Sequence, residues 1–170
     1  MGIPRIKVFI MDVDGVLTDG RIGYGCGSDD EIKFFDVKDG LGLTLLHRCG
    51  IATAVISGRQ SLANRRRLTE LKVTHIIEGC KDKSTGIMEL CGRLGVTPDE
   101  CLYVGDDLID LPAMRMAGIS VAVGDAVPEA KEAATWVMEH NGGRGAIREA
   151  AERLLKSLGL WEKATEAYCK

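Results

Sequence analysis

The sequence lacks an excess of positive charge and has no long apolar run. Its net charge is −3 and its pI is about 5.7, so no overall basic field attracts nucleic acid, and we expect no nucleic-acid partner. The apolar stretch that follows Lys7, residues 8–11, is far too short to cross a membrane. The residues before it do not resemble a signal peptide. These absences predict a cytoplasmic protein that does not contact membranes.

The sequence also lacks the cysteine spacing of a zinc site. Its six cysteines are scattered, with no Cys-x-x-Cys pair and no histidine near them at metal-ligand spacing. We therefore expect ordinary reduced thiols. No repeat, low-complexity segment or linker divides the chain, and 45% of its residues are hydrophobic, enough for a real core. Residues 1–170 are predicted to form one domain.

What the chain has is a regular alternation of apolar runs and segments of helical composition. The apolar runs, bounded by turn residues, are 6–11, 52–56, 75–77, 102–104, 119–123 and 136–138. The helical segments are 41–48, 61–71, 84–94, 108–117 and 129–134, followed by a longer closing helix at 144–158. Continuous hydrophobicity favours strands buried on both faces. The pattern predicts an α/β fold with a doubly wound, mostly parallel sheet.

One segment breaks this alternation. Residues 21–24 and 31–35 are typical of two short strands, and the stretch between them, 25–30, is rich in turn residues. We therefore expect residues 21–36 to contain a β-hairpin that projects from the sheet.

Polar residues that can perform chemistry follow four of the predicted strands. They are Asp12 and Asp14 after the first, Ser57, Gly58 and Arg59 after the second, Lys83 after the third, and Asp106, Asp107 and Asp110 after the fourth. In an open α/β sheet the ligand site lies beyond the carboxyl ends of the strands. The sequence therefore predicts that acids, a hydroxyl and a lysine converge at one edge.

Helix capping is the alternative explanation for some of these residues. Preference for N-caps alone can account for Asp107, Asp110 and Ser57. It explains Asp12 and Asp14 poorly, because two carboxylates at i and i+2 after an extended run can point the same way and repel each other unless a cation neutralises them. Oxygen ligands without thiolate or imidazole indicate Mg²⁺.

A lysine facing such an acidic cluster favours phosphate chemistry. Lys83 begins a predicted helix, the wrong end of the helix dipole for a cation, but there it can hold a phosphate and an aspartate together. Phosphate monoesters hydrolyse extremely slowly unaided. A carboxylate nucleophile divides the reaction into two steps, and Mg²⁺ and lysine offset the repulsion between this anion and the phosphate. A second carboxyl group gives its proton to the leaving alcohol in the first step and activates water in the second.

The four motifs, in this order, resemble those of the phosphatases of the haloacid dehalogenase superfamily. The resemblance implies that Asp12 is the nucleophile and Asp14 the general acid and base. It implies that Ser57 binds a phosphate oxygen and that Lys83 steadies the phosphate. By the same resemblance, Mg²⁺ is held by Asp12, Asp106 and the backbone carbonyl of Asp14, while Asp107 and Asp110 support those ligands.

The spacing of the motifs narrows the resemblance to the cap-less branch. The stretch from Asp14 to Ser57 has room only for the hairpin and one helix, and the stretch from Ser57 to Lys83 only for a helix and a strand. Residues 12–20, 37–40, 105–110 and 142–146 closely resemble the 3-deoxy-D-manno-octulosonate 8-phosphate phosphatase family. This implies hydrolysis of a sugar acid phosphate in lipopolysaccharide biosynthesis. It also implies a homotetramer in which hairpins associate and wall neighbouring sites.

The same resemblance supplies expected substrate contacts. They are Asp14, Gly58, Arg59, Arg67 and Lys83, together with a loop formed by Asp36, Val37, Lys38, Asp39 and Gly40. Asp36 and Lys38 replace the usual Asn and Arg, and Thr44 stands where an arginine is often found. A phosphatase for a related nine-carbon keto sugar acid phosphate therefore stays open. The glycine-rich segment 142–145 could bring Arg144 to a site, while the three histidines match no catalytic role.

Two alternatives come from non-enzyme classes. A receiver domain shares the doubly wound sheet, the acidic Mg²⁺ pocket, a hydroxyl and a lysine, but its phospho-acceptor aspartate follows a later strand. Here Ser57 follows the second long apolar run, and Asp14 has an acid/base role available. A catalytically inactive accessory domain is also conceivable, although the complete motif set argues against it. Turnover of a phosphomonoester separates these alternatives from an enzyme.

Overall fold

A six-stranded parallel sheet forms the centre of the molecule in the computed structural model, which describes residues 5–27 and 31–169. The strands are β1 (Val8–Met11), β4 (Ala52–Ile56), β5 (His75–Ile77), β6 (Cys101–Gly105), β7 (Ile119–Ala122) and β8 (Trp136–Val137). Their spatial order is β5-β4-β1-β6-β7-β8, and each neighbouring pair is parallel. The predicted α/β fold with a doubly wound sheet is confirmed.

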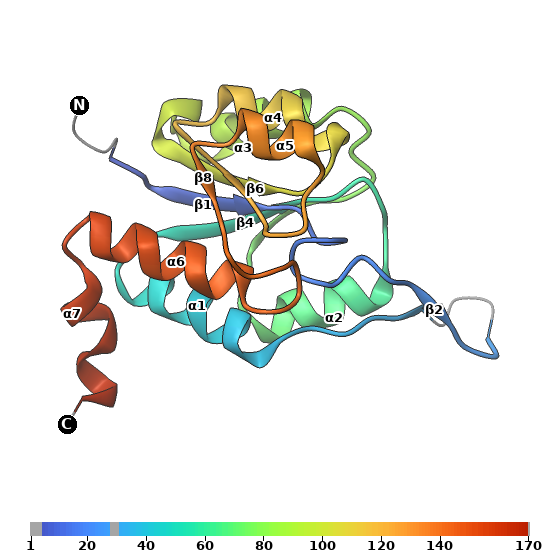
Figure 1. Cartoon of the computed structure of the whole chain (residues 1–170), viewed down its shortest axis with the longest axis horizontal. Helices are drawn as coiled ribbons and strands as arrows, with labels where there is room; N and C mark the ends of the chain where they lie inside the picture. The colour runs from blue at the N-terminus through green and yellow to red at the C-terminus, as the bar shows by residue number, and fades with distance from the viewer. Residues whose placement is uncertain (1–4, 28–30, 170) are drawn as a thin grey trace.

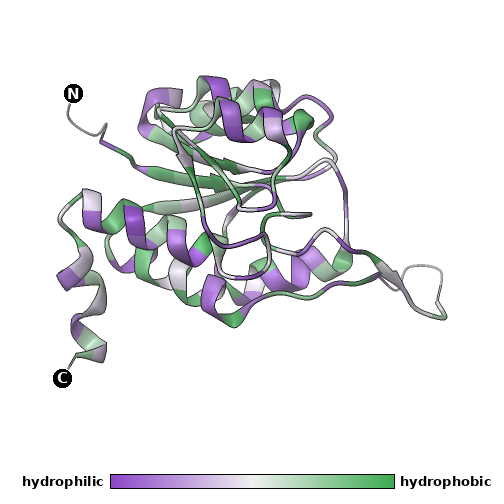
Figure 2. Ribbon diagram, in the orientation of Figure 1, coloured by the Kyte–Doolittle hydropathy of each residue, from purple (hydrophilic) through white to green (hydrophobic). Residues whose placement is uncertain are grey.

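Helices cover both faces of this sheet (Figure 1). They are α1 (Val37–Arg48), α2 (Leu62–Glu70), α3 (Lys83–Leu94), α4 (Leu111–Met116), α5 (Pro128–Ala133), α6 (Ala146–Ser157) and α7 (Trp161–Thr165), with short 3₁₀ turns at Pro98–Glu100, Leu108–Asp110 and Glu166–Tyr168. In Figure 1, α3, α4 and α5 lie above the sheet, and α1, α2 and α6 lie below it. Figure 2 shows that hydrophobic residues dominate the strands between the two layers.

Burial on both faces explains the continuous apolar runs of the sequence. Every residue of β1 is buried, and Phe9 and Ile10, whose side chains point to opposite faces, are both fully inaccessible. The lower layer also needs close packing. A Cβ at Gly42 of α1 would lie 3.0 Å from the Arg148 Cα of α6, so glycine lets the two helices approach.

The strand order places a crevice at the end of β1. The chain leaves β1 for β4 on one side and later crosses to β6 on the other side. Ligands bind at such a switch point in open α/β sheets, outside the carboxyl ends of the strands. The topology therefore predicts a ligand site at the same edge of the sheet as the sequence motifs do.

The hairpin is present, but its ladder is shorter than predicted. Strand β2 (Gly23–Tyr24) pairs antiparallel with β3 (Glu31–Ile32), and the hairpin projects from the body (Figure 1). The predicted turn falls partly on residues 28–30, which lie outside the described residues. A two-stranded ribbon without a face on the core keeps few ladder bonds. Residues 33–35 continue as an extended arm toward α1.

Local capping explains where two helices differ from the sequence prediction. Helix α1 begins at Val37 instead of 41, because the Asp36 side chain accepts a hydrogen bond from the Lys38 N–H, 2.7 Å away. The predicted helix 108–117 is divided into a 3₁₀ turn and α4, where a capping box joins Asp107 and Asp110. Among the described residues, no helix is long and apolar enough to cross a membrane.

Candidate active site

Asp12 and Lys83 form a buried ion pair at the end of the central strand. Asp12 follows β1 and is 3% exposed, and the Lys83 ammonium lies 2.9 Å from its Oδ1. Lys83 comes from the first turn of α3 and also donates to the Ile56 carbonyl at the end of β4. Burial raises the pKa of Asp12 to about 6, although the Lys83 ammonium acts in the opposite direction. The pair thus joins the ends of β1 and β4 to the first turn of α3.

Asp106 brings a second carboxylate to the same point. It follows β6, and its carboxylate lies against Gly15, so closely that a Cβ at Gly15 would overlap it. Burial, reinforced by the charges of Asp110, Asp12 and Asp107, raises the pKa of Asp106 to about 8. Gly15 has φ +89°, in the left-handed region that favours glycine. Glycine is therefore required here for two reasons.

Asp110 holds the loop that carries Asp106. Its Oδ2 accepts from the backbone N–H groups of Asp106 and Asp107 at 3.0 and 3.3 Å. Its Oδ1 accepts from the Tyr103 hydroxyl at 2.8 Å and lies 3.4 Å from the Lys83 ammonium. Burial raises the pKa of Tyr103, so its hydroxyl keeps the proton that it donates. Asp107 is exposed and caps the following 3₁₀ turn.

The other predicted site residues reach the same edge of the sheet from the end of β4 and from the loop after β1. Ser57 is 1% exposed at the end of β4, and its hydroxyl accepts from the Arg59 N–H at 3.2 Å. Gly58 lies in the exposed turn between them. Asp14 contacts the ammonium of Lys33 at 2.6 Å and the guanidinium of Arg59 at 3.7 Å. The predicted residues therefore gather, but Asp14 points toward the hairpin arm.

The acidic cluster fits a magnesium ion. Oxygens of Asp12, Asp106 and Asp110 lie within 4.8 Å of one another, and carboxylate oxygen is the donor that Mg²⁺ prefers. The raised pKa values of Asp12 and Asp106 mark a site where uncompensated negative charge is costly. Because Asp110 already accepts from two N–H groups and a hydroxyl, Asp12 and Asp106 are the carboxylates with oxygens available.

The predicted substrate loop occupies the first turn of α1. Asp36 caps the helix, and Val37 and Lys38 are exposed on it. Asp39 points inward instead. It is 1% exposed, and its two oxygens accept from the backbone N–H groups of Gly145 and Arg148. Burial raises the pKa of Asp39 to about 6. Its carboxylate thus ties α1 to the beginning of α6.

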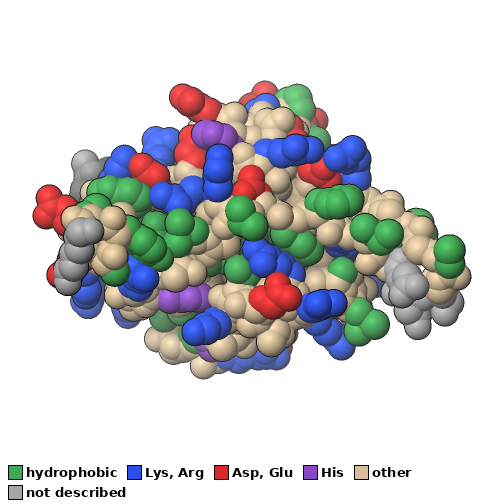
Figure 3. Space-filling model, turned by 90° about the horizontal axis from the view of Figure 1, so that it is seen from below, with side chains coloured by type: hydrophobic (Ala, Val, Ile, Leu, Met, Phe, Trp, Pro, Cys, Tyr) green, Lys and Arg blue, Asp and Glu red, His purple; other side chains and the backbone are tan. Residues whose placement is uncertain are grey.

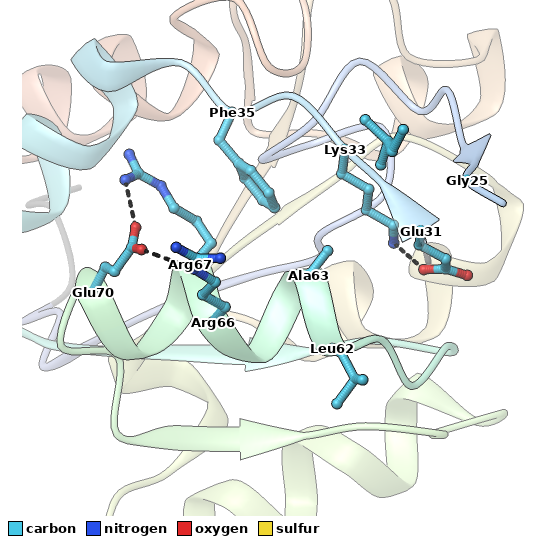
Figure 4. Close-up of a pocket in the computed structure, with 10 residues that line it drawn as sticks. Gly25, Glu31, Lys33, Phe35, Leu62, Ala63, Arg66, Arg67 and Glu70 are labelled. Atoms are coloured by element: carbon cyan, nitrogen blue, oxygen red, sulfur yellow. Dashed lines mark hydrogen bonds and ion pairs between the residues drawn. The ribbon is translucent and has the colours of Figure 1, made fainter. Parts of the chain in front are cut away.

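Arg67 reaches a groove between the hairpin arm and α2. The groove, shown in Figure 4, has a volume of about 640 Å³. The Arg67 guanidinium lies 5.9 Å from the Phe35 ring centre, and a Cβ at Gly40 would come within 2.9 Å of it. In Figure 4, Lys33 and Phe35 descend from the arm, while Ala63 and Arg67 rise from α2. Gly40 therefore leaves room for the arginine.

The glycine-rich segment packs on the loop that follows Asp12. The Gly143 N–H donates to the Val16 carbonyl at 2.9 Å, and a Cβ at Gly142 would overlap the carbonyl of Gly15. Arg144 is 3.5 Å from Asp19. Within this chain, the segment supports the site loop, and Arg144 lies beside Asp19 at the edge of the loop.

Sequence reasoning missed three residues that contact the predicted site. In the sequence, Tyr103 falls within a predicted apolar strand, Gly15 within the first motif, and Lys33 within the predicted hairpin. The polar residues Glu31 and Lys33 alternate with Ile32 and Phe34. That alternation was the available signal that two charged side chains of the arm share one side.

Comparisons with known proteins agree with this geometry. The family model described as haloacid dehalogenase-like hydrolase matches residues 59–150. The 3-deoxy-D-manno-octulosonate 8-phosphate phosphatase of Haemophilus influenzae is 41% identical over 157 residues, which cover 92% of this chain and 87% of that protein. The phosphatase of the same name from Escherichia coli K12 is 40% identical over 160 residues, covering 94% of this chain and 85% of the relative.

Solved structures show the same likeness in three dimensions. A 3-deoxy-D-manno-octulosonate 8-phosphate phosphatase from Moraxella catarrhalis, in complex with a magnesium ion, a phosphate ion and a KDO molecule, superposes with a TM-score of 0.93 at 40% identity, covering 97% of this chain and 94% of that chain. The cobalt-bound phosphatase from Haemophilus influenzae has a TM-score of 0.88 at 41% identity, covering 92% and 91% of the two chains.

Proposed function

Because the chain belongs to the 3-deoxy-D-manno-octulosonate 8-phosphate phosphatase family of haloacid dehalogenase-like hydrolases, we propose that it hydrolyses that sugar acid phosphate in lipopolysaccharide biosynthesis. The products are the free sugar acid and inorganic phosphate. The observation that carries the proposal is the Asp12–Lys83 pair, 2.9 Å apart and nearly inaccessible to water at the switch point of the sheet. A carboxylate held beside a fixed ammonium is suited to attack an anionic phosphoryl group.

The proposed reaction has two steps. An Asp12 carboxylate oxygen forms a bond to phosphorus while the ester P–O bond breaks, and the leaving alcohol oxygen takes a proton from Asp14. Water then attacks the aspartyl phosphate. The bond between phosphorus and Asp12 breaks, and Asp14 receives the proton that the water loses. Lys83 and the Ser57 hydroxyl hold phosphoryl oxygens throughout.

Magnesium is the proposed cofactor. Asp12, Asp106 and the Asp14 backbone carbonyl would hold it, and Asp107 and Asp110 would keep the Asp106 loop in place. When bound, Mg²⁺ offsets the negative charge of the phosphoryl group and of the carboxylates around it. The complex of the Moraxella catarrhalis relative with a magnesium ion and a phosphate ion supports this proposal.

Arginines are the proposed ligands of the sugar acid. Arg59 and Arg67 offer forked donors that suit a carboxylate, and they flank the arm of the hairpin. Contacts from Gly58, Asp36, Val37 and Lys38 remain part of the proposal. For Asp39, an indirect role suits its position, because its oxygens bind the start of α6.

A substrate comparison tests the proposed function. Phosphate release by the purified protein in Mg²⁺ should be measured with the eight-carbon and the nine-carbon keto sugar acid phosphates. We expect a higher kcat/KM for the eight-carbon substrate. A tenfold preference for the nine-carbon substrate, about 1.4 kcal/mol in transition-state binding, would make the chain a phosphatase of that acid instead. Absence of turnover with both would contradict the proposal.

We also propose that the protein works as a homotetramer. The exposed apolar side chains Tyr24, Ile32 and Phe34 are 75%, 49% and 69% exposed on the hairpin and its arm, and hydrophobic side chains line the projecting end in Figure 3. A two-stranded ribbon with a free edge and such side chains is suited to pair with other copies. Neighbouring hairpins would then cover sites that have no cap domain of their own.

A further inference from the structure

Two ion pairs connect the hairpin and its arm to the site. Glu31 and Lys33 stand at i and i+2, so their side chains share one side of the extended arm. The Lys33 ammonium lies 2.6 Å from Asp14 Oδ1, and the Arg59 guanidinium lies 2.6 Å from Glu31 Oε1. Arg59 also approaches Asp14, at 3.7 Å. These four side chains form one cluster of alternating charges.

Burial sets Lys33 apart from the other residues of the arm. Its side chain is 0% exposed, although the residue as a whole is half-buried, whereas the whole residues Ile32 and Phe34 are 49% and 69% exposed. An arm that exposes its apolar side chains and buries a lysine reverses the usual preference. Removing an ammonium from water is costly unless it gains a close partner. Asp14 is that partner, and Glu31 lies farther away, at 3.6 Å.

The contact distinguishes the two carboxylate oxygens of Asp14. Oδ1 is held by Lys33. Oδ2 is buried and has no hydrogen bond among the described residues, and the Nε of Arg59 lies 3.7 Å from it. A carboxyl group that transfers protons needs one oxygen anchored and the other directed at the reacting atoms. In this structure Oδ1 is anchored and Oδ2 is left without a hydrogen bond, and the anchor comes from the hairpin rather than from the strands of the sheet.

We propose that Lys33 is a positioning residue for Asp14. By holding Oδ1, it fixes the carboxyl group so that Oδ2 passes the proton to the leaving alcohol. The hairpin of each subunit is thereby part of its own proton-transfer apparatus, in addition to any contact with a neighbour. This inference rests on the proposed phosphatase function.

Leaving-group chemistry isolates this role. An alcohol is a poor leaving group and needs the proton from Asp14, whereas p-nitrophenolate departs without it. Lys33→Met removes the ammonium but keeps a flexible chain of similar length in the buried position. We expect kcat/KM for the sugar acid phosphate to fall by at least about 10-fold, a part of the 10²–10⁴-fold that general acid catalysis contributes. The value for p-nitrophenyl phosphate should change by less than about threefold, well below that range.

A double-mutant cycle shows whether Lys33 acts through Asp14. Asp14→Asn should give the same selective loss in kcat/KM, which does not include the hydrolysis of the aspartyl phosphate. Adding Lys33→Met to it should cause little further loss in kcat/KM, because coupled residues are not additive. The matched control is Lys7→Met, which breaks an ion pair with Glu100 of the same length, 2.6 Å, outside the site, and should leave both rates unchanged. Comparable melting temperatures would show that each variant is folded.

Three outcomes would overturn the inference. They are an equal loss with both esters, an unchanged rate with both, and additive losses in the double variant. Each leaves the proposed function standing as long as the wild-type protein hydrolyses phosphate esters in Mg²⁺. A wild-type protein inactive on both esters would instead remove the proposed function itself.

Discussion

At the scale of single residues, Asp12 is the most exacting position. We expect Asp12→Asn to lower kcat by at least roughly 10⁴-fold, as removal of a nucleophile does elsewhere, because the amide cannot form the aspartyl phosphate. The fold should persist, since the volume barely changes and the crowded acids lose one charge. Steady-state phosphate release and a thermal melt check both points. Activity within tenfold of wild type would remove Asp12 as the nucleophile.

Gly15 permits a second residue-scale prediction with a control inside the chain. Gly15→Ala and Gly50→Ala both place a Cβ at positive φ, +89° and +76°, which costs about 1–2 kcal/mol of stability. Only the Cβ at position 15 would overlap the Asp106 carboxylate, since nothing lies within 4 Å of it at position 50. We therefore expect weaker Mg²⁺ binding in Gly15→Ala alone, measured by calorimetric titration. Equal affinities in the two variants would contradict this role of Gly15.

At the scale of elements, the hairpin has two faces with different expected roles. Its exposed face carries Tyr24, Ile32 and Phe34, and its inward face carries Glu31 and Lys33. Replacing Tyr24 and Phe34 with Ser should dissociate the proposed tetramer, because exposed apolar area drives association. Light scattering at micromolar concentration measures this. A wild-type monomer near 18.4 kDa that is fully active would end the assembly proposal.

At the scale of the whole molecule, the acidic cluster links stability, pH and metal. The pKa values of Asp12 and Asp106 are raised by burial to about 6 and about 8. Unfolded carboxyl groups titrate near pH 4, so between about pH 4 and 8 these two groups bind more protons in the folded state. Their contribution to the free energy of unfolding of the metal-free protein therefore falls as the pH rises.

Urea unfolding at several pH values tests this linkage. In chelator, wild-type protein should lose stability relative to Asp106→Asn between pH 5 and 8, because the variant lacks the raised carboxyl group. Added Mg²⁺ should reduce or reverse the loss, since it binds the deprotonated folded site. A wild-type protein that gains stability relative to the variant over this range, without metal, would show that the pKa of Asp106 is not raised.

The sequence by itself determined the architecture and most of the site. Apolar runs buried on both faces predicted the parallel sheet, and parallel strands bring their carboxyl ends to one edge. Asp12, Ser57, Lys83 and Asp106 therefore had to meet, whatever the details of the loops. Strand periodicity and topology are properties of order along the chain, so they can be read from the sequence.

Only the tertiary structure decided where individual side chains of the loops and helix starts point. Asp39 lies in the predicted substrate loop but turns inward to the N-terminus of α6, which follows more than a hundred residues later in the chain. Lys33 belongs to a hairpin that local pattern describes as exposed, yet its ammonium is buried against Asp14. Both directions depend on partners distant in sequence, because a buried charge points to wherever folding brings its hydrogen-bonding partners.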